Sequence, residues 1–279
     1  MSESFQRPPL DPTPWHAVRR HGRLWRRFAL QAVVRETHFR AHLAATVVVG
    51  IVQSALSLLP LLLLYSYTDD VNGWSQGEVI ALTGVFQLTV SILAICVETN
   101  MGRLSSAIRS GDLDLVLVRP VSGQFYMTLR WLQPGELFNV LTGAGLIAVG
   151  LIRDGASPSP VDVVQGVLLI ACGCVLLTCL WSATAIVAFW LTSVEPLPML
   201  FRDLLGAGMF PLGFYPGSVR IFLTFVFPVG FATTFPTEAL VGEGSWGAVV
   251  LGIALSAGML LLLRAYWRIA VRSYASASS

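Results

Sequence analysis

The sequence contains no lysine, so all 18 of its basic residues are arginine. Without lysine the chain cannot complete the phosphate-binding motif G-x-x-x-x-G-K-[ST] and cannot form a lysine Schiff base. A nucleotide-driven motor of that type and Schiff-base chemistry are therefore excluded from this chain. Charge of either sign is also scarce, because only 12% of the residues are charged and the net charge is +2. That net charge is too small to indicate binding to nucleic acid.

Histidine and cysteine are few, with four of each. His38 and His42 have the spacing of a zinc-binding pair, with Glu36 nearby, but two histidines do not complete a zinc site. We favour a position for them near lipid headgroups. Packed or lipid-facing small side chains explain the cysteines better than a metal cluster does, so we expect no metal and no disulfide. The cysteines are Cys96, Cys172, Cys174 and Cys179.

Long uncharged runs make up most of the remaining chain. Residues 44–67 are 24 consecutive residues without a charge, and about 20 apolar residues in a helix cross the hydrocarbon core of a bilayer. The mean hydropathy of +0.69 agrees with a membrane protein. We predict an all-α integral membrane protein with six transmembrane helices. The six runs are 44–67, 79–97, 129–152, 163–194, 221–237 and 245–263.

The third and fifth runs are irregular. Arg130 and Glu136 lie in the first turns of the third run, so its reliable apolar part begins at Leu137. Pro228 and Pro236 each remove a backbone donor from the fifth run. We expect that helix to be kinked or broken, with re-entry as an alternative to a straight crossing.

The arginines predict the orientation and the domain organisation. With six spans, 17 of the 18 arginines fall on one side of the membrane and only Arg153 falls on the other. The positive-inside rule then places both termini in the cytoplasm. The expected parts are a disordered tail (1–14), an amphipathic interfacial helix (15–43), a six-span domain (44–274) and a C-terminal tail (275–279).

The interfacial helix is predicted from apolar and basic residues on opposite faces. The apolar face would enter the acyl boundary while the arginines reach lipid phosphates. A solvated basic leader is the alternative. The apolar residues are Trp25, Phe28, Ala29, Ala32 and Val33, and the basic ones are Arg19, Arg23, Arg26 and Arg27.

The segment 98–125, between the second and third runs, predicts a short amphipathic helix on the cytoplasmic side. Met101, Leu104 and Ile108 form one apolar stripe, and Gly111 suits a left-handed helix end. Asp112 is placed to cap a second short turn. Such a helix, held between two spans, could receive force from a soluble partner. A helix lying on lipid headgroups is the alternative. Asp114 lies in the second turn, and Arg119 and Pro120 stop it.

Glu136 is the best candidate for a buried functional acid. It could line a substrate path beside Asn139, with Pro228 and Pro236 shaping a gate. The competing interpretation, which we favour from sequence, is an interfacial carboxylate paired with Arg130.

The loop Ile108-Arg-Ser-Gly-Asp-Leu-Asp-Leu-Val-Leu-Val-Arg-Pro-Val-Ser122, followed by Phe125, resembles the signature loop of the ABC-2 type permeases, in the group of six-span bacterial exporter subunits. Similar matches occur at Tyr215-Pro216 and in the paired prolines of 227–237. The Arg-rich, Lys-free N-terminal helix departs from the family in residue choice.

The resemblance implies a transmembrane permease subunit of an ABC exporter in the cell inner membrane. Two permease chains, identical or paralogous, would form the pathway for an amphiphilic substrate. Separate ATPase subunits would bind ATP and Mg, so this chain would not be an enzyme and would need no cofactor of its own. The segment from Met101 to Arg119 would be the main coupling element. A secondary carrier or channel without an ATPase, and a membrane scaffold without transport activity, are the alternatives.

Overall fold

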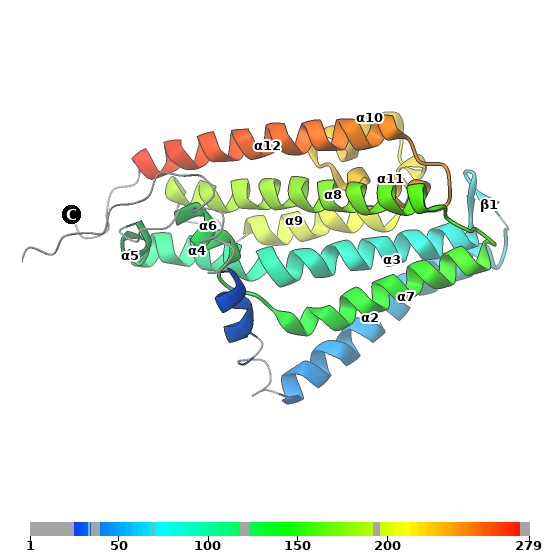
Figure 1. The fold of residues 1–279 in the computed structure, drawn as a ribbon, viewed down its shortest axis with the longest axis horizontal. Coiled ribbons are helices and arrows are strands. Elements are labelled where there is room, and N and C mark those ends of the chain that lie inside the picture. Colours follow the sequence, from blue (N-terminus) through cyan, green and yellow to red (C-terminus); the bar gives the residue numbers. More distant parts are fainter. Residues whose placement is uncertain are drawn as a thin grey trace, which may run out of the picture.

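A computed structural model of the chain describes residues 25–32, 34, 40–68, 70–117, 123–191 and 196–273. These residues form long helices that lie roughly side by side (Figure 1). The first half contains α2 (Arg40–Tyr65), β1 (Asp70–Val71), β2 (Trp74–Ser75), α3 (Gln76–Leu93), the π-helix η1 (Ala94–Glu98), α4 (Thr99–Ser110), α5 (Leu113–Leu117) and α6 (Gly123–Leu129). The predicted tails, Arg119, Pro120 and the histidine pair lie outside the described residues or outside the described side chains.

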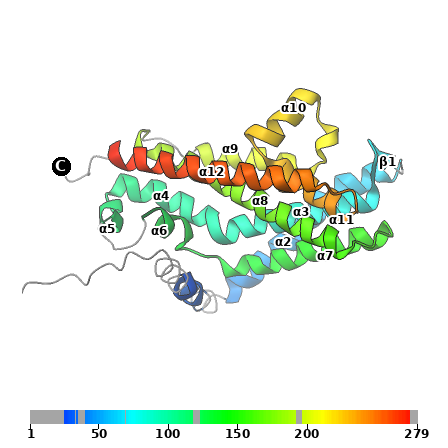
Figure 2. The same cartoon turned by 45° about the horizontal axis from the view of Figure 1, so that its top comes forward.

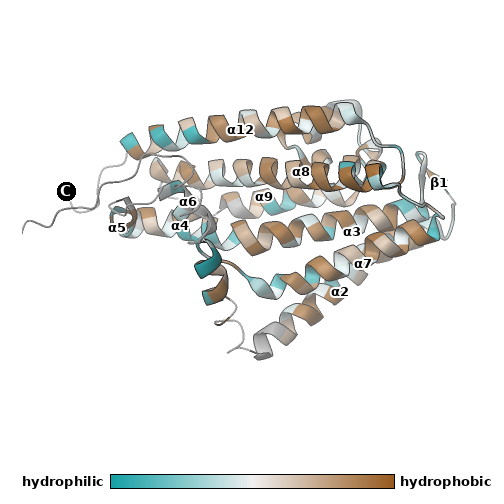
Figure 3. Cartoon of the chain, viewed as in Figure 1, coloured by the Kyte–Doolittle hydropathy of each residue, from teal (hydrophilic) through white to brown (hydrophobic). Residues whose placement is uncertain are grey.

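The second half contains η2 (Pro134–Glu136), α7 (Leu137–Arg153), α8 (Pro160–Ile186), η3 (Val187–Phe189), α9 (Pro196–Gly206), η4 (Ala207–Met209), η5 (Leu212–Phe214), α10 (Gly217–Ile221), the π-helix η6 (Phe222–Val226), η7 (Val229–Phe231), α11 (Thr234–Leu240) and α12 (Trp246–Ser273). Within the described ranges, five helices are long and apolar enough to cross a membrane, or six if the bent pair Gly217–Val226 and Val229–Leu240 counts as one span. The candidate spans are Ala44–Tyr65, Gln76–Ile108, Pro134–Arg153, Pro160–Phe189 and Trp246–Ser273. Brown, hydrophobic residues cover these helices in Figure 3.

The two ends of the bundle differ. At one end, which we call the hairpin end, β1 and β2 pair as a short antiparallel hairpin, and Tyr65 Oη donates a hydrogen bond of 2.8 Å to the carbonyl oxygen of Trp74. Ser75 caps α3 with a capping box and also donates its hydroxyl to Asp154. At the opposite end, the α4 end, lie α4, α5, α6 and the end of α12 (Figure 2).

The α4 end also holds the described part of the predicted interfacial helix. Residues 25–32 are helical, and the ring of Phe28 meets Tyr126 of α6 edge to face at 5.9 Å. Ala32 is buried, whereas Trp25 remains exposed. Part of the predicted apolar face therefore packs on protein, and both the N-terminal helical residues and the end of α12 lie at the same end of the bundle.

The most extensive contact between described helices joins α3 to α7, and glycines line it. Gly84 lies against the backbone of Gly143, and Gly77 lies against the backbone of Gly150. Because glycine has no side chain, the two backbones approach directly, which is how membrane helices often pack in the absence of a hydrophobic driving force between them.

The segment α9–η5 runs antiparallel to α3 from the α4 end to the hairpin end. Arg202 of α9 forms an ion pair with Glu98, at the α4 end of the span. Further along, Gly208 packs against Phe86, and Gly213 faces Trp74 of the hairpin. The sequence did not predict this segment, because charged and glycine-rich positions interrupt its apolar pattern.

The predicted fifth span, 221–237, is bent, as its prolines led us to expect. The paired segments Gly217–Val226 and Val229–Leu240 are bent by 73° at the break before Val229. Phe227, at the bend, packs on Phe201 with ring centroids 5.1 Å apart, and Leu240 returns to Gly166 near the start of α8. The two outer ends of the segment therefore lie toward the hairpin end while its bend lies further into the bundle, which favours the re-entrant alternative, and we call the segment the re-entrant loop.

The two prolines of this loop have different effects. Pro228 lies at the bend, where its missing backbone donor ends the π-helix η6. Pro236 lies in the first turn of α11, where the backbone N–H has no intrahelical partner in any case, so it does not break the helix. The break predicted from the two prolines is confirmed at Pro228 only.

The re-entrant loop also changes the place of one arginine. Arg220 donates hydrogen bonds to the carbonyl oxygens of Leu212 and Gly213, which lie at the hairpin end. The sequence analysis counted Arg220 on the other side, so that prediction is wrong because it assumed a straight fifth span. Arg220 joins Arg153 at the hairpin end, and the charge asymmetry is one arginine smaller than predicted.

Candidate functional site

A pocket of about 580 Å³ lies between α2, α3 and α9 on the half of the bundle nearer the α4 end. Its volume is in the range of small-molecule sites. The apolar part of its wall comes from aliphatic, aromatic and sulfur-containing side chains of these helices and of η4. These apolar residues include Val49, Phe86, Val90, Leu93, Leu205 and Met209.

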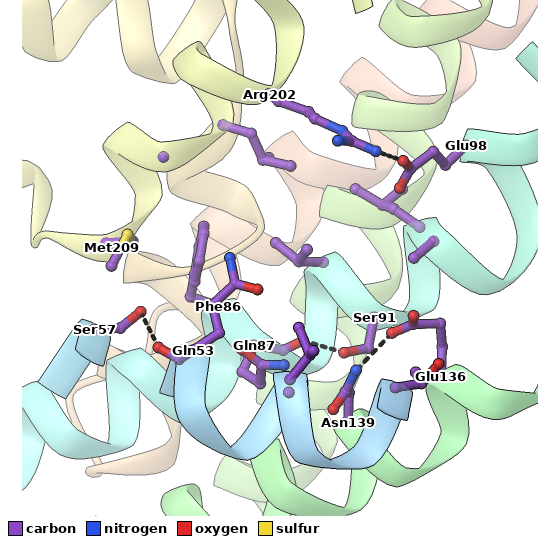
Figure 4. Close-up of a pocket in the computed structure, with 18 of the residues that line it drawn as sticks. Gln53, Ser57, Phe86, Gln87, Ser91, Glu98, Glu136, Asn139, Arg202 and Met209 are labelled. Carbon is purple, nitrogen blue, oxygen red and sulfur yellow. Dashed lines mark hydrogen bonds and ion pairs between the residues drawn. The ribbon is translucent and has the colours of Figure 1, made fainter. Parts of the chain in front are cut away.

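Polar side chains line the same pocket (Figure 4). The hydroxyls of Ser57 and Ser91 donate to the carbonyl oxygens of Gln53 and Gln87 one turn earlier. Among the described residues, nothing pairs with the side-chain amides of Gln53 and Gln87. A ligand in the pocket would therefore meet amide donors and acceptors on both α2 and α3.

An ion pair closes one side of the pocket. Glu98 is the last residue of the π-helix η1, and Arg202 projects from α9 to meet it (Figure 4). The π-helix adds a wider turn between α3 and α4, a feature often found at functional sites. The sequence analysis noted Glu98 only as an acid near a span end, and nothing in the sequence connects it to Arg202.

Glu136 and Asn139 lie together in the pocket wall, as the substrate-path hypothesis predicts. The side-chain amide of Asn139 donates a hydrogen bond of 2.7 Å to Glu136. Asn139 Oδ1 lies against the α-carbon of Gly50 in α2, and it is buried without a hydrogen-bond partner. The pocket wall thus includes one buried acceptor without a partner.

The predicted ion pair between Glu136 and Arg130 is wrong. The guanidinium of Arg130 lies 4.8 Å from the ring centroids of both Tyr126 and Trp131. Tyr126 lies before the break between α6 and η2, and Trp131 lies within it. Cation–π contacts with these two rings hold the arginine away from Glu136. No cation forms an ion pair with Glu136 among the residues described.

Trp181 of α8 forms the floor of the pocket. Its ring stacks on Phe201 at 4.5 Å, and only 3% of its surface is exposed. The indole Nε1 is buried without a hydrogen-bond partner. An unpaired donor in such a place costs free energy, about 1–3 kcal/mol, unless something else accepts from it.

The predicted coupling helix, α4, is continuous with the second span. α4 is not a separate helix between two spans, because α3, η1 and α4 run on as one helix, Gln76–Ile108. The third span begins later than residue 129, since α6 is separate and the apolar helix starts at η2 and Leu137. Asn100 holds this region together through hydrogen bonds with both the N–H and the carbonyl oxygen of Trp131.

The apolar stripe of α4 faces the protein interior. Met101, Leu104 and Ile108 are buried in the main core beside α8 and η3. The stripe is therefore not a free surface for a partner, because the bundle itself covers it. The exposed side of α4 carries Arg103 and Ser106, and Arg103 lies 3.9 Å from the ring centroid of Trp131.

The turn after α4 has the predicted geometry. Gly111 adopts the left-handed conformation with φ 77°, and α5 follows at once. Asp112 is exposed and accepts a hydrogen bond of 2.7 Å from the Ser110 hydroxyl. Leu115 of α5 is 64% exposed, while its neighbours Leu113 and Val116 are buried. The surface available at this end is therefore the tip formed by Gly111, Asp112, Asp114 and Leu115.

The cysteines and the possible metal ligands are the remaining features singled out in the sequence. All four cysteines are free thiols, and two of them, Cys172 and Cys179, are buried, as packed small residues would be. Among the described residues, no group of three or more potential ligands could hold a metal ion.

These features define a multi-pass helical membrane protein with a pocket between its helices. A family model described as an ABC-2 family transporter protein matches residues 51–278, so the chain belongs to that family and is a permease of an ABC transporter. Comparison with curated proteins and with solved structures gives no match. The fold, the pocket and the family thus agree on a role in transport across a membrane.

Proposed function

We propose that this chain is the transmembrane permease of an ABC exporter in the inner membrane, with its α4 end in the cytoplasm. It pairs with a second permease chain, identical or paralogous, and separate ATPase subunits that bind ATP and Mg drive it. The observation that carries the proposal is the continuous helix Gln76–Ile108, which joins the pocket wall to the surface at the α4 end. Since this sequence has no lysine, a P-loop has to come from another chain.

The ATPase contact in this proposal is the tip after α4. Gly111 turns the chain sharply, and Asp112, Asp114 and Leu115 then stand at the end of the long helix. A displacement of this tip would be passed along the helix to Glu98 and its partner Arg202. The buried stripe of Met101, Leu104 and Ile108 serves to fix α4 to the rest of the bundle.

The proposal is tested by purifying the native complex. The chain is tagged at its C-terminus and extracted in mild detergent from native membranes, and the co-purifying proteins and ATP hydrolysis are measured. We expect stoichiometric recovery of a P-loop ATPase, with or without a second six-span chain. Recovery of the chain alone, together with transport driven only by an ion gradient in ATP-free liposomes, would instead identify a secondary carrier.

A charge reversal tests the tip itself. The double variant Asp112→Arg and Asp114→Arg is expected to lose substrate-stimulated ATP hydrolysis and transport while the complex stays folded. The matched control is Glu243→Arg, an exposed acid at the hairpin end, which should leave both activities unchanged. Normal stimulated hydrolysis in the double variant would rule out this tip as the ATPase contact.

A further inference from the structure

The pocket carries an uncompensated negative charge. Its lining includes two carboxylates, Glu98 and Glu136, and one guanidinium, Arg202. Arg202 is already paired with Glu98. Glu136 has only a neutral partner, the amide of Asn139, at 2.7 Å. The carboxylate that remains is therefore Glu136.

The nearby arginines do not neutralise Glu136. Arg103 lies over the ring of Trp131 at 3.9 Å, and Arg130 lies over Tyr126 and Trp131 at 4.8 Å. Both cations are thus held by aromatic faces outside the pocket. A carboxylate at the edge of an apolar pocket, without a cation of its own, is expected to attract one from a ligand.

Two buried polar atoms in the wall also lack partners. Asn139 is 7% exposed and its Oδ1 has no hydrogen-bond partner, and Trp181 is 3% exposed and its Nε1 has none. The side-chain N–H of Asn139 faces the Glu136 carboxylate, whereas its Oδ1 lies against Gly50 of α2. Both unpaired atoms have almost no exposed surface, so they are buried polar groups of the wall and a ligand would not touch them directly. The polar group that a ligand can reach is therefore the Glu136 carboxylate.

The remaining wall is apolar and aromatic. Phe86 and Met209 lie in the part of the pocket between α2 and α9 (Figure 4). Val90 and Leu205 are further apolar residues of the lining. An aromatic face adds attraction for a cation, and aliphatic side chains suit a hydrocarbon body.

We propose that this pocket binds a cationic amphiphile, with the positive group at the Glu136 carboxylate and the apolar body between α2 and α9. This inference rests on the proposed export function, for which it names the substrate class. The charge of the ligand decides the selectivity, because Glu136 is the only carboxylate of the pocket lining without a cationic partner among the described residues. An anionic amphiphile of the same size would meet repulsion at the same place.

The test uses two ions of matched size and opposite charge, tetraphenylphosphonium and tetraphenylborate. The full chain in nanodiscs of neutral lipid is dialysed against each ion, and binding to empty nanodiscs is subtracted. We expect saturable binding of tetraphenylphosphonium and none of tetraphenylborate. Equal saturable binding of both ions, or binding of tetraphenylborate alone, would overturn the proposal, and this comparison needs no variant.

Variants then locate the charge. Glu136→Gln is expected to weaken tetraphenylphosphonium binding about tenfold or more, whereas Glu136→Asp retains most of it. Glu243→Gln removes one exposed acid at the hairpin end and should have no effect. Unchanged affinity in a folded Glu136→Gln chain would overturn the proposal.

The two proposals fail in different ways. A chain that co-purifies with an ATPase but does not distinguish the two ions keeps the exporter function and loses the cationic substrate. A chain that binds tetraphenylphosphonium through Glu136 but recovers no ATPase keeps the pocket and loses the exporter function.

Discussion

Asn100 is completely buried and joins three backbone groups at the α4 end. Its side-chain amide donates to the carbonyl oxygens of Cys96 and Trp131 at 2.8 and 2.7 Å, and its Oδ1 accepts from the N–H of Trp131 at 2.9 Å. These bonds fix the chain that follows α6 against the continuous helix Gln76–Ile108. One side chain thus determines where the third span can start.

We expect Asn100→Leu to lower the free energy of unfolding by about 2 kcal/mol or more, because three hydrogen bonds to the backbone of Cys96 and Trp131 would be lost. Thermal unfolding of the purified chain measures the change. Ser106→Ala, on the exposed side of α4, removes only a local hydrogen bond to Gly102 and should have little effect. Equal melting temperatures for the two variants would contradict this role of Asn100.

Individual side chains in the pocket were predictable only in part. Glu136 and Asn139 stood out in the sequence as polar residues at the start of an apolar run, and the structure brings them into contact. The error concerned Arg130, which prefers aromatic rings to the carboxylate. The pair of Glu98 and Arg202 joins two helices far apart in the chain, so no local pattern could indicate it.

At the scale of elements, the glycine contact of α3 and α7 can be tested within one helix. A methyl group on Gly143 would lie 2.8 Å from the backbone nitrogen of Leu88 and 2.9 Å from the carbonyl oxygen of Gly84. Backbone atoms cannot move aside as a side-chain end can, so we expect Gly143→Ala to destabilise the bundle by about 1–3 kcal/mol.

Gly145, two residues further along α7, is the matched control. Nothing lies within 4 Å of the place where its side-chain carbon would be. Gly145→Ala should therefore be neutral or slightly stabilising, since alanine favours a helix over glycine. Melting temperatures of the two purified variants measure the difference in stability. An equal loss of stability in both would contradict the role of the Gly143 contact.

The elements divide into those that hydropathy finds and those that it misses. The first predicted run, 44–67, corresponds to α2, Arg40–Tyr65. The sixth, 245–263, corresponds to α12, Trp246–Ser273. Hydropathy did not identify α9–η5 as a candidate span, because Arg202 and Asp203 interrupt it. The apolar re-entrant loop was predicted as the fifth span instead. Pro228 could be found from the sequence as a break, but the contact of Phe227 with Phe201, which lies beside the bend, could not.

At the scale of the whole molecule, the re-entrant loop makes a prediction about membrane sidedness. Ser218 of α10 is exposed and should lie on the same side as Asn72 of the hairpin. In a chain without its four native cysteines, Ser218→Cys and Asn72→Cys should react with an impermeant maleimide from the same face of intact cells or vesicles. Ser106→Cys of α4 should react only from the other face.

The opposite labelling result would contradict the re-entrant loop. If residues 221–237 crossed the membrane, Ser218→Cys would react from the face of Ser106→Cys instead. The labelling pattern therefore separates the re-entrant alternative, in which α9–η5 crosses the membrane, from a kinked fifth span that crosses at 221–237.

The class of the molecule was predictable from sequence, because uncharged runs of this length are rare outside membrane-spanning helices. The sequence also predicted both termini on one side of the membrane; the end of α12 and residues 25–32 lie at the same end of the bundle, and the side of the membrane stays a prediction. The pocket could not be predicted, since it depends on the angle at which α2 and α9 approach α3.

The unbroken helix from the hairpin end to the tip after α4 also has a mechanical consequence. A helix followed by a loose loop can slip, so that a push on the loop is absorbed before it reaches the membrane. Here 33 residues form one helix, Gln76–Ile108, and most of its pocket-lining residues lie in its middle third, with Glu98 just beyond them. Any tilt applied at Gly111 therefore changes the width of the pocket in the same movement. If the chain is driven by an ATPase as proposed, the number of substrate molecules moved per ATP hydrolysed is expected to be nearly constant, with little uncoupled hydrolysis.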